Sequence, residues 1–211
     1  MELITALIDF ILHIDRHLVD IIQTYGTWTY LILFMIIFSE TGFVVTPFLP
    51  GDSLLFVIGA LGAKEALDFE LALFLLLVAA VGGNTLNYFI GKMIGHKLLA
   101  TKNSRLIKKE YLYKTQAFYQ KHGGKAIILS RFIPIIRTFA PFVAGLGKMS
   151  FMRYSLYNVI GGFSWVFLFM FAGFFFGNIP AVKDNFTYVI FAIIFVSLLP
   201  TIVPYLRGKR R

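Results

Sequence analysis

Hydrophobic residues run along this chain in long stretches, separated by short polar and charged segments. Two stretches, residues 71–94 and 151–178, are each long enough to cross a bilayer as a helix, because about 20 apolar residues span its hydrocarbon core. A third stretch, about residues 186–206, is also long enough, and Pro200 and Pro204 would bend it. The pattern therefore predicts three transmembrane helices.

Two further apolar segments are interrupted by proline and carry charged residues. Residues 27–38 and 53–62 flank a turn that contains two prolines, and residues 126–147 are interrupted by Pro134. Runs of about a dozen apolar residues are too short to span, so each broken segment predicts a re-entrant helical hairpin. We assign the breaks in these hairpins to four residues: Pro47, Pro50, Gly51 and Pro134.

Each hairpin is preceded by an amphipathic segment and followed by a spanning one. Residues 2–22 place Leu and Ile at helical spacing with acids between them, and residues 97–121 are basic and amphipathic. Such helices lie in the membrane interface more readily than they cross it. The order amphipathic helix, hairpin, span therefore occurs twice, in about residues 1–95 and 97–178, within a single membrane domain of residues 1–211.

The two predicted repeats have opposite orientations in the membrane. If each hairpin enters and leaves on one face, only the span of residues 71–94 separates them, so they dip in from opposite sides. The charges agree, because the connection 64–70 is mostly acidic, whereas basic residues gather between 92 and 125 and at the C-terminal end. We predict an all-α integral membrane protein with an inverted repeat and a C-terminal transmembrane helix that ends in the cytoplasm. The side of the N-terminus stays open.

The composition agrees with a membrane protein. Of the 211 residues, 58% are hydrophobic and 15% are charged, whereas soluble domains contain about 25% charged residues. The net charge of +9 could indicate nucleic acid, but the basic residues lie beside hydrophobic segments, which indicates membrane orientation and anionic lipid instead. Cys is absent, and His13 and His17 have no third ligand nearby, so we predict neither a metal nor a cofactor.

Four charged residues lie inside the broken apolar segments. Glu40 and Asp52 flank the first turn, and Arg131 and Arg137 flank Pro134. A charged side chain in hydrocarbon is costly, so such groups pair, line a wet cavity or bind a solute. A guanidinium matches phosphate oxygens, and the protonation of a carboxyl responds to its surroundings. We predict that the arginines bind a phosphate headgroup and that the two acids are a proton-coupling charge pair, which holds the arginines while the site is empty.

Simpler interpretations of these polar residues stay open. The four charged residues could form a purely structural lock between the hairpins, and Asp52 could cap a helix. Three further polar residues in the first span are candidates to line the same cavity, or they could bond to a neighbouring helix: Asn84, Asn87 and Tyr88.

Four motifs occur in order along the chain. They are FSETG at residues 38–42, PxxPGD at 47–52, GNxxxYxxGKxxG at 83–95 and SRFxPxxR at 130–137. Together they resemble the DedA family of bacterial inner-membrane proteins, relatives of the eukaryotic VTT-domain lipid scramblases. The resemblance implies transport of lipid-linked phosphates, with the acidic pair and the arginine pair as functional residues. Many members carry Asp where this chain has Asn84, which speaks against a proton-carrying role at that position.

The sequence therefore predicts a transporter that flips or scrambles lipid-linked phosphates, undecaprenyl phosphate or phospholipid, across the bacterial inner membrane, with proton coupling left open. The main alternative is a proton- or cation-coupled antiporter of small solutes, for which buried carboxylates suffice. A lipid phosphatase, which would need a catalytic His, is disfavoured because none of the four histidines lies by the arginines in the sequence. A membrane assembly factor is disfavoured by the embedded charges. The expected partners are anionic lipid and protons but not nucleic acid, and an oligomer stays open.

Overall fold

The computed structural model of the chain describes residues 24–43, 51–100, 109–147 and 149–183, with single positions near residues 20–22 and 185–195. All regular structure in these ranges is helical: α3 (Trp28–Gly42), α4 (Gly51–Gly62), α5 (Phe69–Ala100), α6 (Lys109–His122), the 3₁₀ turn η1 (Gly123–Lys125), α7 (Ala126–Ser130), α8 (Pro134–Leu146), α9 (Phe151–Phe176) and α10 (Pro180–Lys183).

Some predicted features lie outside the described residues. The N-terminal amphipathic helix and the final crossing at about 186–206 fall almost entirely in undescribed parts of the chain, and Pro47 and Pro50 do so completely. These features therefore stay predictions from the sequence.

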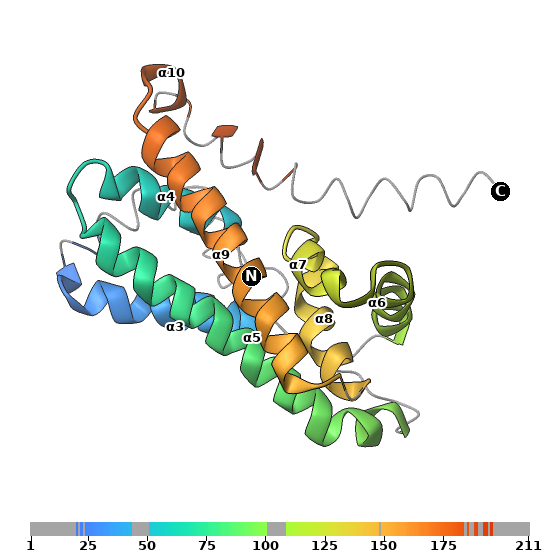
Figure 1. Ribbon diagram of the computed structural model, residues 1–211. Helices are drawn as coiled ribbons and strands as arrows, with labels where there is room; N and C mark the ends of the chain where they lie inside the picture. The colour runs from blue at the N-terminus through green and yellow to red at the C-terminus, as the bar shows by residue number, and fades with distance from the viewer. Residues whose placement is uncertain are drawn as a thin grey trace, which may run out of the picture.

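Helices α5 and α9 form the centre of the molecule. Among the described residues, Phe69–Met93 and Phe151–Phe176 are long and apolar enough to cross a membrane. The two helices cross in the view of Figure 1 and pack against each other. They correspond to the predicted spans, except that α5 continues to Ala100 because no proline interrupts this stretch. The expected amphipathic segment at 97–121 therefore starts inside α5, and its described helix, α6, begins only at Lys109.

The short helices form two pairs around this centre. Helices α3 and α4 have 15 and 12 residues, and α7 and α8 have 5 and 13, all below the length of about 20 residues that spans a bilayer. Helix α7 ends at Ser130 and α8 begins at Pro134, where the ring sets a helical φ and the missing N–H is not needed. The second apolar segment is thus interrupted beside the proline that the sequence singled out.

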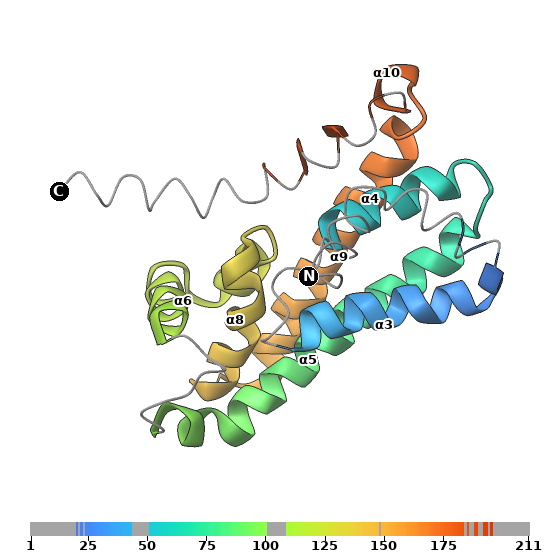
Figure 2. The ribbon, with the colours of Figure 1, turned by 180° about the vertical axis from the view of Figure 1, so that it is seen from behind.

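Each long helix is contacted by one short helix from each pair. Helix α3 packs along α5 and α7 packs on α9, whereas α4 packs along α9 and α8 packs along α5. Views from the front and the back both show α3 beside α5 and α4 beside α9 (Figures 1 and 2). The second helix of each pair is therefore attached to the long helix that follows the other pair.

Glycines bring α4 and α9 into backbone contact. A Cβ atom at Gly59 would overlap the carbonyl oxygen of Met170, and one at Gly173 would overlap the carbonyl oxygen of Phe56. Small residues allow helices in membranes to approach closely, where van der Waals contact holds them together. This crossing consequently depends on both glycines.

The crossing of α8 with α5 repeats this arrangement. A Cβ atom at Gly91 would overlap the carbonyl oxygen of Phe142, and one at Gly145 would overlap that of Tyr88. In both crossings each glycine faces the carbonyl oxygen of a residue on the other helix. That residue lies three positions before the other helix's own glycine. The two glycine crossings between the halves of the chain therefore share one geometry.

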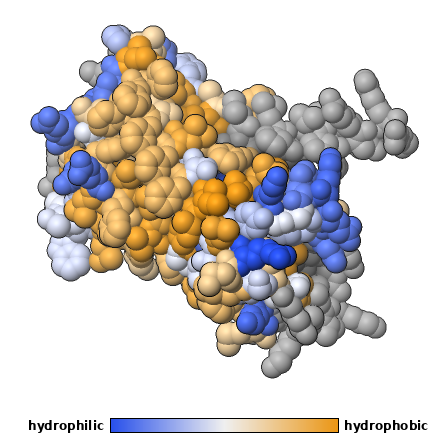
Figure 3. Space-filling model, viewed as in Figure 1, coloured by the Kyte–Doolittle hydropathy of each residue, from blue (hydrophilic) through white to orange (hydrophobic). Residues whose placement is uncertain are grey.

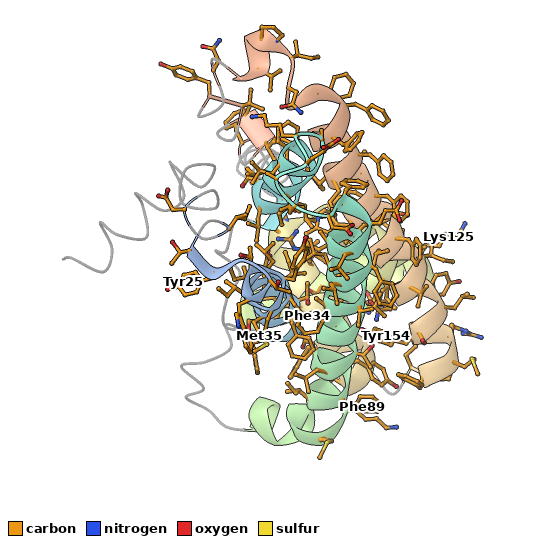
Figure 4. All side chains as sticks on the ribbon, turned by 90° about the vertical axis from the view of Figure 1, so that its left-hand side faces the viewer. Tyr25, Phe34, Met35, Phe89, Lys125 and Tyr154 are labelled. Carbon is orange, nitrogen blue, oxygen red and sulfur yellow. The ribbon has the colours of Figure 1, made fainter. Side chains whose placement is uncertain are left out.

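The apolar core lies where α3, α4, α5 and α9 meet. Its buried side chains include Leu33, Ile37, Leu55, Ile58, Leu76 and Val166. A smaller buried cluster joins α5, α7, α8 and α9 and consists of Tyr88, Ile127, Ala144 and Tyr154. Figure 4 shows Tyr154 between α9 and α5, whereas Tyr25 and Lys125 lie at opposite sides of the molecule.

The outer surface is apolar over the long helices and polar over α6. Hydrophobic residues cover the face above α5 and α9, and hydrophilic residues gather where α6 and η1 lie (Figure 3). Large exposed hydrophobic residues on the two long helices include Phe74, Val78, Leu156, Phe163, Leu168 and Phe175. A soluble monomer rarely exposes so large an apolar face, so this surface suits contact with lipid.

Helix α6 is attached to α8 through Tyr119. The Tyr119 hydroxyl donates to the carbonyl oxygen of Ala140 in α8 at 2.9 Å. Burial raises the pKa of Tyr119, so the hydroxyl stays protonated and remains a donor. The polar helix α6 is thereby held against the middle of α8.

The glycine crossings generate a first prediction. Gly91→Ala should destabilise the protein by about 1–3 kcal/mol, because the new methyl group meets backbone atoms of α8 that cannot turn aside. Gly82→Ala in the same helix is the matched control, since its Cβ would lie 3.5 Å from the Phe38 ring. Thermal unfolding in detergent micelles measures both, and an equal shift for the two variants would contradict the close crossing.

Candidate functional site

Arg137 holds both predicted acids. Its Nη1 donates to Asp52 Oδ1 at 2.6 Å, and its Nη2 donates to Glu40 Oε1. Glu40 lies in the last turn of α3, Asp52 in the first turn of α4 and Arg137 in the first turn of α8. All three are buried, with 1%, 8% and 4% of their surfaces exposed, so protein rather than water surrounds these ion pairs. One guanidinium thus joins three short helices.

The helix ends favour one of these charges and oppose another. Asp52 stands at the N-terminal end of α4, where the helix dipole stabilises a negative charge. Arg137 stands at the N-terminal end of α8, where the same dipole disfavours a positive charge. The two carboxylates therefore offset both the burial of the guanidinium and its unfavourable position.

Gly51 makes room for the Glu40 carboxylate. A Cβ atom at Gly51 would overlap Glu40 Oε2, and both other atoms of the carboxyl group would be crowded as well. Any other residue at this position would push the carboxylate away from Arg137. Gly51 therefore determines where the acid lies, in addition to standing at the start of α4 as a predicted hairpin break.

Arg131 lies beside this cluster, but its partners are neutral. Its Nη2 donates to the carbonyl oxygen of Ala80 at 3.1 Å and to Asn158 Oδ1 at 2.9 Å. The residue is 1% exposed, and its Nη1 has no hydrogen-bond partner in the described part of the chain. This differs from the expected arrangement, in which the carboxylates hold both arginines. The reason is the turn after α7, which aims Arg131 at α5 and α9, whereas Arg137 starts from α8 and reaches α3 and α4.

Trp165 connects the two arginines. The Cζ atoms of Arg137 and Arg131 lie 4.9 Å and 5.7 Å from the centre of its ring. Its Nε1 donates to Asp52 Oδ1 at 2.7 Å, and the residue is fully buried. A cation over an aromatic face gains about 0.5–2 kcal/mol, the more so when it is desolvated. The indole therefore lowers the cost of burying two like charges close together.

Asn158 joins Arg131 to α5. Its Oδ1 accepts from Arg131, and its Nδ2 donates to the carbonyl oxygen of Val81 at 3.0 Å and to Thr85 Oγ1 at 3.2 Å. The amide is completely buried in α9. Its acceptor and its donor are both used, so its orientation is determined by α5.

Asn84 adds a second amide next to Arg131. With its amide turned so that Nδ2 donates to the Thr41 carbonyl oxygen at 3.2 Å, its Oδ1 accepts from Arg131 Nη2 at 3.0 Å and Nε at 3.3 Å. In the opposite orientation Nδ2 would donate to Asn158 Oδ1 at 3.2 Å but would also face the guanidinium, donor against donor. We favour the first orientation for that reason.

The other two candidate cavity residues bond to neighbouring helices. Asn87 Nδ2 donates to a carbonyl oxygen of α8 at 2.8 Å and to one of α3 at 3.3 Å. The Tyr88 hydroxyl donates to the carbonyl oxygen of Met149 at 2.5 Å, and its ring stacks on Tyr154 with 4.3 Å between centres. Asn87 thus lies near the charged cluster, while Tyr88 belongs to the aromatic cluster further along α5.

Sequence reasoning missed Asn158 and Trp165. Each has a side chain that can form hydrogen bonds and lies inside a predicted span. This is a weak signal of a functional site, because such residues often serve only helix packing. Both lie on one face of α9, at positions seven residues apart, and this face meets the break between α7 and α8. Only the packing of that break against α9 distinguishes them.

The fold and this cluster define a class: an all-α membrane protein with buried charges at the ends of short helices. The chain matches the VTT domain over residues 49–175. It belongs to the VTT-domain family, the DedA family of membrane proteins, as the sequence motifs indicated.

The relatives agree with this assignment. Protein DedA of Escherichia coli strain K12 is 56% identical over 212 aligned residues, which cover 100% of this chain and 97% of that protein. The uncharacterized membrane protein ML0287 of Mycobacterium leprae is 43% identical over 83% of this chain and 79% of its own length. The inner membrane protein YqjA of Escherichia coli strain K12 is 34% identical over 72% and 69%. No solved structure matches the chain.

The ion pairs of Arg137 generate a second prediction. Arg137→Met should destabilise the protein by about 3–5 kcal/mol, because it leaves two carboxylates buried without their cation. Arg153→Met is the control, since Arg153 is exposed in α9 and should change stability by less than about 0.5 kcal/mol. Unfolding in detergent, followed by circular dichroism, compares the two, and similar small shifts would show that the ion pairs are not structural.

Proposed function

We propose that this chain flips or scrambles lipid-linked phosphates, undecaprenyl phosphate or a phospholipid, between the leaflets of the bacterial inner membrane. The observation that carries the proposal is the buried guanidinium of Arg131, which has neutral hydrogen-bond partners and one nitrogen without a partner among the described residues. An always-charged fork of donors suits phosphate oxygens better than any other common anion-binding group. The proposal gives no residue of the site a role in making or breaking a bond, so it describes a transporter rather than an enzyme.

The packing supports an inverted repeat around this site. Each short-helix pair would be a re-entrant hairpin, and the two equivalent glycine crossings are what a repeated unit would produce. Transporters of this construction bind substrate where the repeats meet, near the bilayer midplane. The basic loop after α5 and the basic C-terminal end would then both be cytoplasmic.

The charge balance of the site favours proton coupling. The two arginines and the two acids together carry no net charge when all four are ionised. A phosphate that joins them makes the buried cluster negative, which is costly in a low-dielectric environment. Protonation of Glu40 or Asp52 would restore neutrality and would loosen the contacts of Arg137. Movement of the headgroup and movement of a proton are thereby linked.

One observation favours a second candidate, a proton- or cation-coupled antiporter of small solutes. Two buried carboxylates share a single guanidinium, and a cation could replace that guanidinium between them. The second candidate gives no task to Arg131, whose hydrogen bonds in the described part of the chain go to neutral acceptors. Lipid exchange therefore distinguishes the two functions.

Reconstitution into liposomes tests the proposal directly. The purified protein should exchange undecaprenyl phosphate or a phospholipid between leaflets, and a pH gradient should change the initial rate. Arg131→Gln should lower the rate about tenfold or more, because a hydrogen bond to a charged group contributes about 1.5–3 kcal/mol. Ser164→Ala is the control, since the exposed Ser164 hydroxyl donates only to the Ile160 carbonyl oxygen of its own helix. Absence of exchange for every lipid tested would favour the antiporter.

A variant without the ion pairs separates transport from a purely structural lock. Glu40→Gln, Asp52→Asn and Arg137→Gln together should recover most of the stability that Arg137→Met loses, because replacing a whole buried ion pair by neutral groups is often nearly neutral. If the charges serve transport, this stable triple variant should move lipid much more slowly than the unaltered chain. An unaltered rate would identify the charges as a structural lock.

A further inference from the structure

We propose that the two arginines of the site have different tasks, and that Asn158 is the positioning residue that separates them. Asn158 holds Arg131 away from the carboxylates, so that Arg131 receives the anionic headgroup while Arg137 joins the helices. This inference rests on the proposed lipid-phosphate transport and specifies which group binds the phosphate.

The first argument is that Arg137 is already neutralised. Both carboxylates of the cluster contact it, one through each terminal nitrogen. A phosphate that competed for Arg137 would have to displace one of two buried carboxylates. These are Asp52, whose Oδ1 lies 2.6 Å from Arg137 Nη1, and Glu40. Replacing one ion pair by another gains little, because desolvation and attraction nearly cancel for both.

The second argument is that Arg131 has only neutral hydrogen-bond partners among the described residues. A backbone carbonyl oxygen and two amide oxygens accept from its Nη2 and Nε, which satisfies hydrogen bonding without cancelling the positive charge. Its Nη1 stays without a partner among the residues that the structure describes, although the side chain is buried. A buried donor of this kind gains most from a charged acceptor.

The third argument is the face of α9 against which the Arg131 side chain packs. A stripe at helical spacing faces Arg131 and consists of Asn158, Gly161, Gly162 and Trp165. A Cβ atom at Gly161 would lie 3.4 Å from Arg131 Cγ, and one at Gly162 would lie 3.5 Å from its Nη2. The glycines thus admit the stem and the head of the side chain, the amide binds the guanidinium, and the indole lies 5.7 Å from its centre.

The carboxylates attract Arg131, so the proposed task requires a residue that holds Arg131 away from them. Glu40 Oε2 is buried beside the Gly51 backbone and accepts no side-chain hydrogen bond within the described ranges, so it is available as an acceptor for a second guanidinium. Asn158 is anchored to α5 through Val81 and Thr85 and therefore cannot follow such a movement. Removing its amide would release Arg131 toward Glu40, and the anion would lose its receptor.

Trp165 allows this binding to be measured without transport. The chain has two Trp residues, and the other, Trp28, is 69% exposed. In a Trp28→Phe background the fluorescence of Trp165 therefore reports the charge around both arginines. Full-length protein in detergent micelles would be titrated with phosphatidic acid, with uncharged diacylglycerol and with inorganic phosphate alone.

Phosphatidic acid should change the fluorescence of the unaltered site, and diacylglycerol should not. Asn158→Ala should raise the half-saturating concentration about tenfold or more, and Asn158→Asp should raise it further because a carboxylate then contacts Arg131. The lipid concentration for half-maximal exchange should rise in parallel, with the maximal rate within about twofold, which a merely structural defect would not produce. Ser164→Ala should leave both readouts unchanged.

The outcomes distinguish this inference from the proposed function. If the unaltered chain neither binds phosphatidic acid nor exchanges lipid, the function is wrong and the inference with it. If it binds and exchanges lipid but folded Asn158→Asp binds as tightly, the inference alone is overturned. Binding of inorganic phosphate with the same dependence on Asn158 supports the inference and identifies a free anion as a ligand. Should the Asn158 variants not fold, Thr85→Ala, which removes one anchor of the amide, should produce a smaller shift in the same direction, and no shift would overturn the inference.

Discussion

Two carboxylates and one guanidinium hold the three short helices α3, α4 and α8 in register. Each of these helices is too short to cross a bilayer, so none is fixed in place by its own length. Apolar contacts between helices contribute little specificity in lipid, because lipid tails are as apolar as the side chains. The contacts of Arg137 supply what is missing, since they are directional and are satisfied in only one arrangement of helix ends. Gly51 and Trp165 support this arrangement, because Gly51 makes room for Glu40 and Trp165 donates to Asp52.

The polar interior therefore contains two kinds of cation. Arg137 contacts two acids and lies over the Trp165 ring, whereas Arg131 contacts amide and backbone oxygens. The same side-chain type serves both because the charge of a guanidinium does not depend on its partners, so it can be neutralised at one position and left available at another. The difference between the two lies in the elements that face them.

Much of the architecture could be read from the sequence because hydrophobic length is a strong signal in membrane proteins. The two spans and the interrupted segment at Pro134 lie where the pattern predicted them, with α5 running further than expected. The charged residues Glu40, Asp52, Arg131 and Arg137 were recognisable because ionisable groups are rare in apolar segments. Their roles stay predictions, as do the inverted repeat and the transported molecule.

The finer contacts could not be predicted because they depend on which helix faces meet. Nothing in the sequence indicates that Arg131 turns toward Asn158 rather than toward Glu40, or that Trp165 lies between the arginines. Those contacts arise from the exchange of α4 and α8 between the long helices. A short polar side chain in an apolar span acquires a specific task only when a partner from another segment reaches it.

That exchange also has a mechanical consequence. Since α4 packs on α9 and α8 packs on α5, a tilt of one long helix against the other would displace the two helices of each pair relative to each other. The ion pairs of Arg137 join α3 and α4 to α8 and would resist such a displacement. A tilt that separates the helices on one side of the bundle would bring them closer together on the other side.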